Sequence, residues 1–284
     1  MVLELLFNPF SLKKKPWHMF TAGFIYSIIG LTISYLVFKE IAGILSVFLI
    51  VLATLPTFYT TIKNEEELDL KYDKEITLLK EHTKVIIYLI FLFLGITSAL
   101  VLAYVILPEP IVNTIFNLQK TAILNVNNNI QANLTGGITK FGLFGRIFFN
   151  NIKVLFFCLL FSLLYGTGAI FILTWNASVI ATAIGNLIKS ELAHSASTVG
   201  FNTIATYFGV VTFGFMRYMT HGILEIASYF IAGLAGGIIS IALIKHNLKE
   251  NKVLIDSLDL ILISLGLLIL AGFVEVYITP IFFA

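Results

Sequence analysis

Charged side chains are scarce in this chain, since Asp, Glu, Lys and Arg make up only 12% of its 284 residues. A soluble domain carries about 25% charged residues. Hydrophobic residues reach 58%, and the mean hydropathy is +0.95. This composition excludes an ordinary soluble domain. It predicts an all-α, polytopic integral membrane helix bundle in which residues 1–284 form a single transmembrane domain embedded in the lipid bilayer.

Other absences narrow the function. The chain has one cysteine, Cys158, which has no second cysteine to pair with inside the chain. No dense Lys/Arg cluster occurs, so a nucleic acid partner is not expected. The patterns G-x-S-x-G and H-E-x-x-H are missing, and no paired aspartates occupy two spans. The sequence therefore favours a protein that is not an enzyme.

The N-terminal part, residues 1–107, contains three apolar runs long enough to cross a bilayer. The stretch between the second and third runs, KNEEELDLKYDKEITLLKEHTK, is the most charged in the chain and is predicted to be a soluble loop or helix pair. A polar, Asn-rich connection follows the third run. The predicted spans are about 19–38, 41–62 and 85–107, and the connection is 108–145.

Lysine positions predict the orientation, because short cytoplasmic loops are rich in Lys and Arg. Lysines at 13–15, within 63–84 and within 245–252 place these segments inside. The chain is therefore expected in the cell membrane with its N-terminus cytoplasmic, 108–145 extracytoplasmic and its C-terminus outside.

The third part, 146–284, holds four apolar segments before the lysines at 245–252, where the lysine pattern requires an odd number of crossings. Joining two of them into one crossing satisfies that requirement. We therefore predict about six transmembrane helices, with a broken or re-entrant segment near 176–219. The four segments are 148–175, 177–188, 203–219 and 221–244.

Three charged residues in an apolar region, Arg217, His221 and Glu225, follow one another at intervals of four. On a helix they form one stripe, and charges at this depth are costly unless they face protein or water. Together with Asn151 and Asn176 they form a predicted intramembrane polar site. Such a site is either a proton or ion relay, or a structural network that fixes helix register.

A metal ion is one cofactor that this site suggests. His221 and Glu225 are spaced as two ligands on one helix face, and His194 is a candidate for a third. Two ligands are fewer than a protein metal site needs. The metal hypothesis therefore depends on the fold bringing a third donor to the pair.

Small residues continue the same side of this segment. A stripe of small side chains lets another helix approach closely. The seam therefore predicts tight helix packing, either within the chain or in a homodimer. Its members are Ser228, Ala232, Gly236 and Ser240.

Three acidic residues of the last span are not assigned to a functional site. Asp256 and Asp259 stand near its start, where a helix N-terminus favours negative charge. Glu275 stands near its other end and is expected close to the outer surface.

Two runs in the C-terminal part carry a family resemblance. FFNNIKVLFFCLLFSLLYGTGAIFILTWNASVIATAIG and HGILEIASYFIAGLAGG resemble the stage II sporulation protein M family over about residues 146–245. Ser228 stands where the family usually has Ala, and Ala177 where it often has Gly. The matching positions are Asn151, Gly166, Asn176, His221, Gly222, Glu225, Ser228, Ala232 and Gly236.

The resemblance implies a non-enzymatic membrane scaffold for membrane or extracytoplasmic protein partners, or a protein that remodels membrane. Bacterial members of the family act in spore engulfment as a scaffold for cell-wall-degrading partners. The alternative from the residues is a transporter or channel that uses the Arg/His/Glu stripe. A lesser alternative is an intramembrane metal-dependent hydrolase.

Overall fold

The computed structural model describes residues 16–71, 75–134, 139–199, 203–245 and 251–282. Within these ranges every regular element is a helix and no strand occurs. Seven of the helices are long and apolar enough to cross a membrane. The prediction of an all-α, polytopic helix bundle is confirmed, with one span more than the expected six.

The first three spans lie close to their predicted positions. A short 3-10 turn, η1, joins the first two spans. Helix α4 extends to Lys71 and α5 begins at Glu75, so both spanning helices extend into the charged stretch 63–84. These elements are α3 (Trp17–Val37), η1 (Lys39–Ile41), α4 (Ala42–Lys71) and α5 (Glu75–Ile106).

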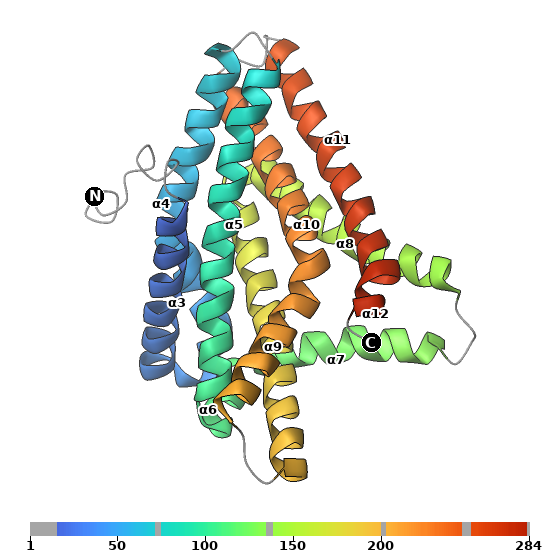
Figure 1. The fold of residues 1–284 in the computed structure, drawn as a ribbon. Coiled ribbons are helices and arrows are strands. Elements are labelled where there is room, and N and C mark those ends of the chain that lie inside the picture. The colour runs from blue at the N-terminus through green and yellow to red at the C-terminus, as the bar shows by residue number, and fades with distance from the viewer. Residues whose placement is uncertain (1–15, 72–74, 135–138, 200–202, 246–250, 283–284) are drawn as a thin grey trace.

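Two further helices, α6 (Glu109–Ile115) and α7 (Asn117–Leu134), build most of the connection between α5 and α8. Helix α7 runs crosswise to the long helices and extends outward from the bundle, and α9 continues past it (Figure 1). Gln119 at its start donates a hydrogen bond from Nε2 to Ser178 Oγ on α9, at 3.2 Å. This buried bond ties α7 to the bundle.

Four long helices make up the C-terminal part. Thr139 caps the first of them, accepting a hydrogen bond on its side chain from the Gly142 amide. The last one passes into a π-helical turn, η3, and a final short helix. The elements are α8 (Lys140–Tyr165), α9 (Ala169–Val199), α10 (Ile204–Ile244), α11 (Asn251–Phe273), η3 (Val274–Ile278) and α12 (Thr279–Phe282).

The helix break in this part falls elsewhere than the sequence indicated. The expected crossing 148–175 is divided at Gly166, whose φ of +69° ends α8 in a conformation that glycine adopts readily. The segment 177–188, expected to be half of a broken crossing, lies inside the uninterrupted α9. Asn176 does not break α9, because its side-chain amide donates to the Ile172 carbonyl of the same helix.

Helix α10 also continues without a break through Gly222. Three helices, α8, α9 and α10, therefore connect 108–145 to Lys245, which satisfies the odd number of crossings in a different way from the one predicted. An odd number of spans also agrees with the lysine pattern, which predicts the start of α3 and the end of the last span on opposite sides. Six would have placed them on the same side, against the lysine pattern.

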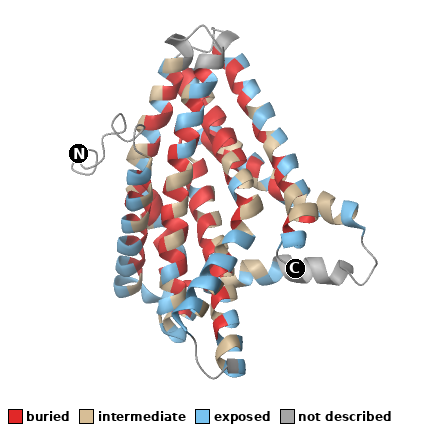
Figure 2. Cartoon of the chain, in the orientation of Figure 1, coloured by how far each residue is buried: buried red, intermediate tan, exposed pale blue. Residues whose placement is uncertain are grey.

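Helix α10 is the centre of the bundle and contacts α8, α9 and α11. Buried residues follow α5, α9 and the C-terminal half of α10, whereas exposed residues follow the outer face of α3 and the N-terminal end of α10 (Figure 2). Exposed apolar side chains are expected where a spanning helix faces lipid.

Candidate intramembrane polar site

Three separate parts of the chain meet at Glu225 of α10. The side-chain amide of Asn151, on α8, donates a hydrogen bond to Glu225 Oε1. The carboxyl group of Glu275, in η3, neighbours that of Glu225. Two acids and an amide from three elements therefore share one location within membrane-spanning helices.

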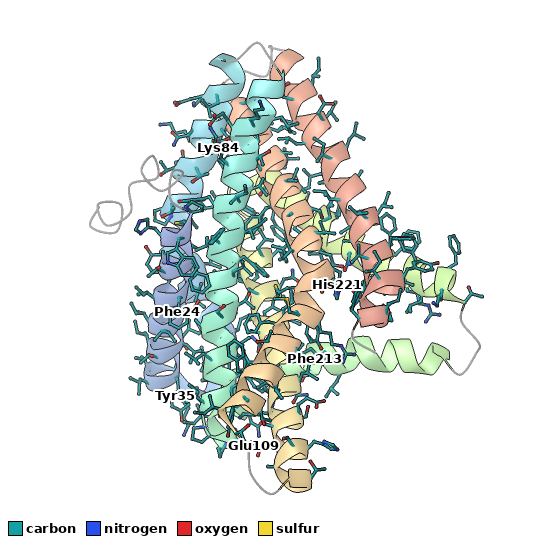
Figure 3. All side chains as sticks on the ribbon, in the orientation of Figure 1. Phe24, Tyr35, Lys84, Glu109, Phe213 and His221 are labelled. Carbon is teal, nitrogen blue, oxygen red and sulfur yellow. The ribbon has the colours of Figure 1, made fainter. Side chains whose placement is uncertain are left out.

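His221 extends the site by one helical turn. Its Nδ1 lies 3.3 Å from Thr279 Oγ1, and that hydroxyl donates to the Val274 carbonyl at 3.2 Å. A hydroxyl that donates to a carbonyl accepts from its other neighbour, so this geometry favours the His221 tautomer with the proton on Nδ1. Figure 3 shows His221 pointing from α10 toward the C-terminal end of the chain.

The π-helical turn has a role in this geometry. It carries Glu275 and ends directly before Thr279, so one irregular turn supplies two members of the site. Single π-helical turns inside helices occur frequently at functional sites. Because this turn is π-helical, the position of Glu275 does not follow the regular helical spacing of α11.

The members of the site are shielded to different degrees. Asn151 and Thr279 are buried, each at 8% exposure. His221, Glu225 and Glu275 are half-buried. Burying ionisable groups at membrane depth is expensive, so polar neighbours are needed to compensate. Each of these three residues has a polar neighbour. His221 contacts Thr279, Glu225 accepts from Asn151, and Glu275 lies beside Glu225.

Close packing of α10 on α8 sets the position of Asn151 relative to Glu225. A Cβ atom added at Gly236 would lie 2.6 Å from the Leu159 carbonyl oxygen of α8, so only glycine permits this approach. The predicted seam is buried throughout and packs within the chain. Its members are Ser228, Ala232, Gly236 and Ser240.

The structure places the other predicted site residues apart from this cluster. Arg217 is exposed on α10. Asn176 bonds within α9, and His194 is exposed near the C-terminal end of that helix. Among the residues that the structure describes, no group of three His, Cys, Asp or Glu side chains could hold a metal ion. The third donor needed by the metal hypothesis is not supplied within this part of the chain.

Sequence reasoning missed Glu275 and Thr279. Glu275 was expected near the outer surface of the membrane and was given no partner, whereas in the structure it is half-buried beside Glu225. One signal could have revealed it, because an acid inside an apolar span is by default a functional candidate. Thr279 carries no such signal, since its contact depends on how α11 packs against α10.

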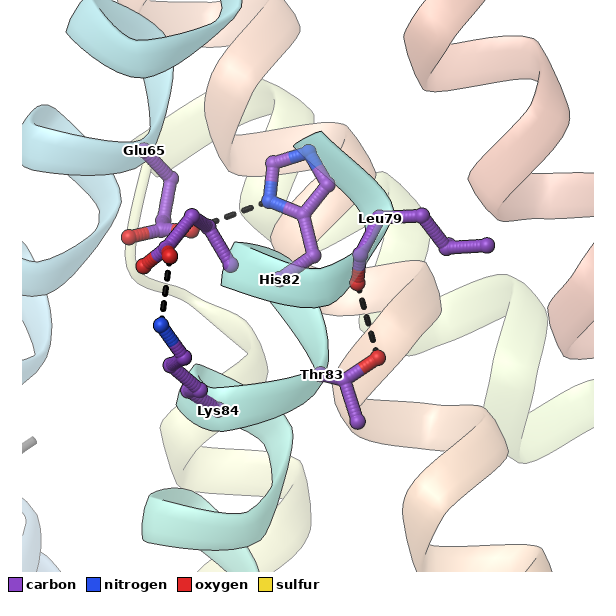
Figure 4. Close-up of polar contacts among 6 residues, drawn as sticks. Glu65, Leu79, His82, Thr83 and Lys84 are labelled. Atoms are coloured by element: carbon purple, nitrogen blue, oxygen red, sulfur yellow. Dashed lines mark hydrogen bonds and ion pairs between the residues drawn. The ribbon is translucent and has the colours of Figure 1, made fainter. Parts of the chain in front are cut away.

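A second polar cluster lies at the C-terminal end of α10, where the sequence predicted a soluble segment. Glu65 and His82 are buried and lie 2.9 Å apart, Oε2 to Nδ1 (Figure 4). Lys245 Nζ lies 2.7 Å from Oε2 of the buried Glu66. The hydrogen bond to Glu66 raises the pKa of Lys245 above its ordinary value, with a smaller contribution from Glu67.

The cluster around Glu225 has a chemical capability that a network of neutral amides lacks. Two neighbouring carboxylates repel each other, and either a proton or a small cation held between them removes that repulsion. Asn151 and His221 provide hydrogen bonds beside the pair. The arrangement can therefore bind and release a positive charge within the spanning region.

The fold and this cluster define a polytopic α-helical membrane protein with ionisable groups among its spans. The model of the family described as stage II sporulation protein M matches residues 85–280, which is more than half of the chain. The chain belongs to this family. The match confirms the resemblance and extends it beyond 146–245, into α5 on one side and to α12 on the other.

A distant relative has been found among curated proteins. The chain is similar to the Uncharacterized protein MJ0793 of Methanocaldococcus jannaschii, with 29% identity over 175 residues. The alignment covers 60% of this chain and 83% of that protein. No solved structure matches the chain.

Proposed function

We propose that this protein moves a small cation or protons across the membrane, with Glu225 and Glu275 as the binding pair. One observation carries the proposal: two carboxyl groups from different elements are neighbours in a region of apolar spanning helices. A network that only fixed helix register would need hydrogen bonds but no pair of acids. Intramembrane ionisable residues mark ion paths and proton relays in many transporters.

Each neighbour has a role in this proposal. Asn151 orients Glu225 by donating to one carboxyl oxygen and leaves the other available to the cation. His221 lies one helical turn from Glu225 and contacts Thr279. It is the next group to which a proton can pass. Arg217 is exposed and takes no part in holding the cation.

The test is a flux measurement on purified protein in sealed liposomes. Proton entry is followed with a trapped pH-sensitive dye, and Na⁺ and K⁺ uptake with radioisotopes. We expect wild-type protein to carry one of these cations and Glu225→Gln to lose the flux at unchanged thermal stability. Glu191→Gln changes an exposed acid on α9 and is the matched control, with flux retained. Equal flux from Glu225→Gln and wild type would contradict the proposal.

A second candidate is the non-enzymatic scaffold suggested by the family. Helix α7 favours it, because it extends outward from the bundle and exposes Leu118 and Leu124. A partner protein, or a second copy of this chain, would bind these side chains. A photo-crosslinking amino acid at Leu124, with Leu36 on α3 as the matched exposed control, tests this in native membranes. Protein adducts at Leu124 alone support the scaffold, and lipid adducts at both positions count against it.

We also propose that the protein lies in the cell membrane with its N-terminus cytoplasmic and residues 108–145 outside. Lysine positions support this orientation. Cys158 is fully buried and is the sole cysteine of the sequence, so an added cysteine reports by itself. Lys80→Cys and Asn113→Cys should then be labelled from opposite faces by a membrane-impermeant maleimide. Labelling of both from one face would reject the orientation.

A further inference from the structure

Two lysines from different helices meet over one tyrosine ring, at the end of the bundle where α5 ends. Lys120 of α7 and Lys189 of α9 place their Nζ atoms 5.3 Å and 5.4 Å from the centroid of the Tyr104 ring. Tyr104 is buried in the last turn of α5, and both lysines are half-buried. This lysine–tyrosine cluster is separate from the site around Glu225, which lies where α8, α10 and η3 meet.

The neighbours of the Tyr104 ring fix its position. A Cβ atom added at Gly185 of α9 would lie 2.6 Å from Cδ1 of the ring, so a larger residue there would displace it. Phe116, between α6 and α7, packs edge-on against the ring, with the two centroids 5.1 Å apart. Both lysines therefore lie beside a fixed aromatic surface, and a ring face attracts a positive charge at this distance.

Among the residues that the structure describes, neither lysine forms an ion pair with an acid. Lys120 Nζ donates to Asn113 Oδ1 at 2.7 Å, and Lys189 Nζ donates to the Leu107 carbonyl at 3.3 Å. Glu109 is an exposed acid at this end of the bundle (Figure 3), and its charge acts on the tyrosine. One acid beside two lysines leaves the cluster positive.

The cluster presents mainly hydrogen-bond donors. An ammonium group has three N–H donors, so each lysine keeps donors for a further acceptor. Asn113 Oδ1 accepts from Lys120, and Asn186 Oδ1 accepts from the Tyr104 hydroxyl at 3.4 Å. Because both amide oxygens are engaged, the NH₂ groups of these two exposed side chains are left to donate. Donors from several helices around a positive charge favour an anion with several acceptor oxygens.

We propose that this cluster binds a phosphate group, with Lys120 and Lys189 supplying the charge and the two asparagine amides as additional donors. Lysine is a common phosphate ligand and acts as a point charge. Two lysines close together also repel each other, and an anion between them removes that repulsion. A phospholipid headgroup is one source of the phosphate, because Tyr104 stands at the end of a spanning helix, where aromatic residues meet headgroups. Free phosphate is the other source.

The test adds two matched lipids to purified full-length protein in a neutral maltoside detergent at fixed ionic strength. Dihexanoyl phosphatidylglycerol carries a phosphate group, and dihexanoylglycerol has the same chains without it. We expect the first to raise the thermal unfolding midpoint in a saturable way and the second to leave it unchanged. Equal shifts from the two lipids would mean that only the chains bind, and would overturn the proposal.

Inorganic phosphate, compared with chloride at matched ionic strength, separates the two sources. A saturable shift with inorganic phosphate shows that the cluster accepts the free anion. A shift with dihexanoyl phosphatidylglycerol alone assigns the cluster to a lipid headgroup. If neither phosphate probe gives a saturable shift, the proposal is wrong.

Variants locate the effect. Lys120→Gln and Lys189→Gln should each raise the apparent Kd of dihexanoyl phosphatidylglycerol about tenfold, as expected for the loss of one charged hydrogen bond. Lys39→Gln is the matched control and should leave the Kd unchanged, because Lys39 is a single exposed lysine, 6.0 Å from the centroid of the Tyr35 ring at the same end of the bundle (Figure 3). Glu109→Gln should lower the Kd, since it removes the acid beside the cluster.

Each variant is compared with its own unfolding midpoint without lipid, so that a loss of stability is not taken for a loss of binding. An unchanged Kd for both Lys120→Gln and Lys189→Gln would overturn the proposed site even if the lipid stabilises the protein. An equal rise for Lys39→Gln would do the same, because any lysine at this end would then serve.

Discussion

The two halves of α10 have opposite surroundings. From Ile226 to Ala242 almost every residue is buried, and many are small. In the N-terminal half, large side chains such as Ile204, Phe208 and Met216 are exposed at 90%, 75% and 54%. The residues of the polar site, His221 and Glu225, lie at the boundary between the halves. One half of the helix therefore holds the bundle together, while the other leaves a boundary at which polar groups remain partly accessible.

The largest effect is expected from a large side chain in the packed half. Gly236→Leu should lower the free energy of unfolding by at least about 3 kcal/mol, at the upper end for overpacking, because the added atoms meet the backbone of α8. Thermal unfolding and size-exclusion profiles measure it. Gly209→Leu is the matched control in the exposed half, where no atom lies within 4 Å of an added Cβ. Equal behaviour of the two variants would remove the distinction between the halves.

A smaller effect is expected at the end of the packed half. Lys245→Met removes the partner of the buried Glu66 and should cost about 1–3 kcal/mol, less than a fully buried pair because 32% of the Lys245 side chain is exposed. Lys84→Met, in the exposed pair with Glu81, should cost less than about 0.5 kcal/mol. Chemical denaturation of both variants gives the comparison.

The same pair predicts a dependence on pH. Because the pKa of Lys245 is raised in the folded protein, its stabilising charge is complete below the ordinary lysine pKa of about 10.4. That contribution is lost as pH rises through the raised value. The difference in unfolding free energy between wild type and Lys245→Met should therefore be constant from pH 7 to 9 and shrink above about pH 10.5. A difference that grew at high pH would contradict the assignment.

At the boundary between the halves the expected effect is smaller still. Asn151→Leu removes a donor to the half-buried Glu225 and should cost about 1 kcal/mol, the lower end for an unsatisfied polar group. Asn176→Leu removes only a bond within α9 and should be milder. Unfolding midpoints of the two variants rank them. A larger loss for Asn176→Leu would argue that Asn176, and not Asn151, belongs with the polar network.

The smallest effect is expected in the exposed half. Arg217→Gln should change the free energy of unfolding by less than about 0.5 kcal/mol, since surface substitutions away from special contacts rarely do more. The same unfolding measurement checks it. A loss above about 1 kcal/mol would place Arg217 in the network as the sequence predicted.

Much of the fold could be predicted from the sequence. The long apolar runs and the positions of the lysines are determined by the lipid bilayer more than by the detailed packing between helices. The helix breaks could not. A hydropathy pattern carries no information about the positive φ of Gly166, where α8 ends. Asn176 was expected near a break, but its side-chain amide donates to a carbonyl of its own helix, which continues through it. The division of the chain at 107/108 and 145/146 stays a prediction.

The candidate site was partly predictable. A stripe at intervals of four predicts that Glu225 and His221 share a side, and the glycine-containing seam predicts a close neighbour. The sequence does not reveal which helix is that neighbour, so Asn151 and Asn176 looked equivalent. Glu275 depends on a π-helical turn, which no spacing rule anticipates. The charged stretch 63–84 was assigned to solvent, but Glu65 and Glu66 are fully buried because α4 meets α5 and Lys245 there.

The length of α10 has a mechanical consequence. At about 1.5 Å per residue, its 41 residues extend about 60 Å, twice the hydrocarbon thickness of about 30 Å. Its apolar exposed end must therefore meet a thickened bilayer, a strong tilt or another protein surface. Tilt and local thickening each carry an elastic energy that depends on the surrounding lipid. Bilayer thickness is therefore a variable that can change the tilt of α10, and His221 and Glu225 lie at the boundary between its exposed half and its buried, glycine-containing half.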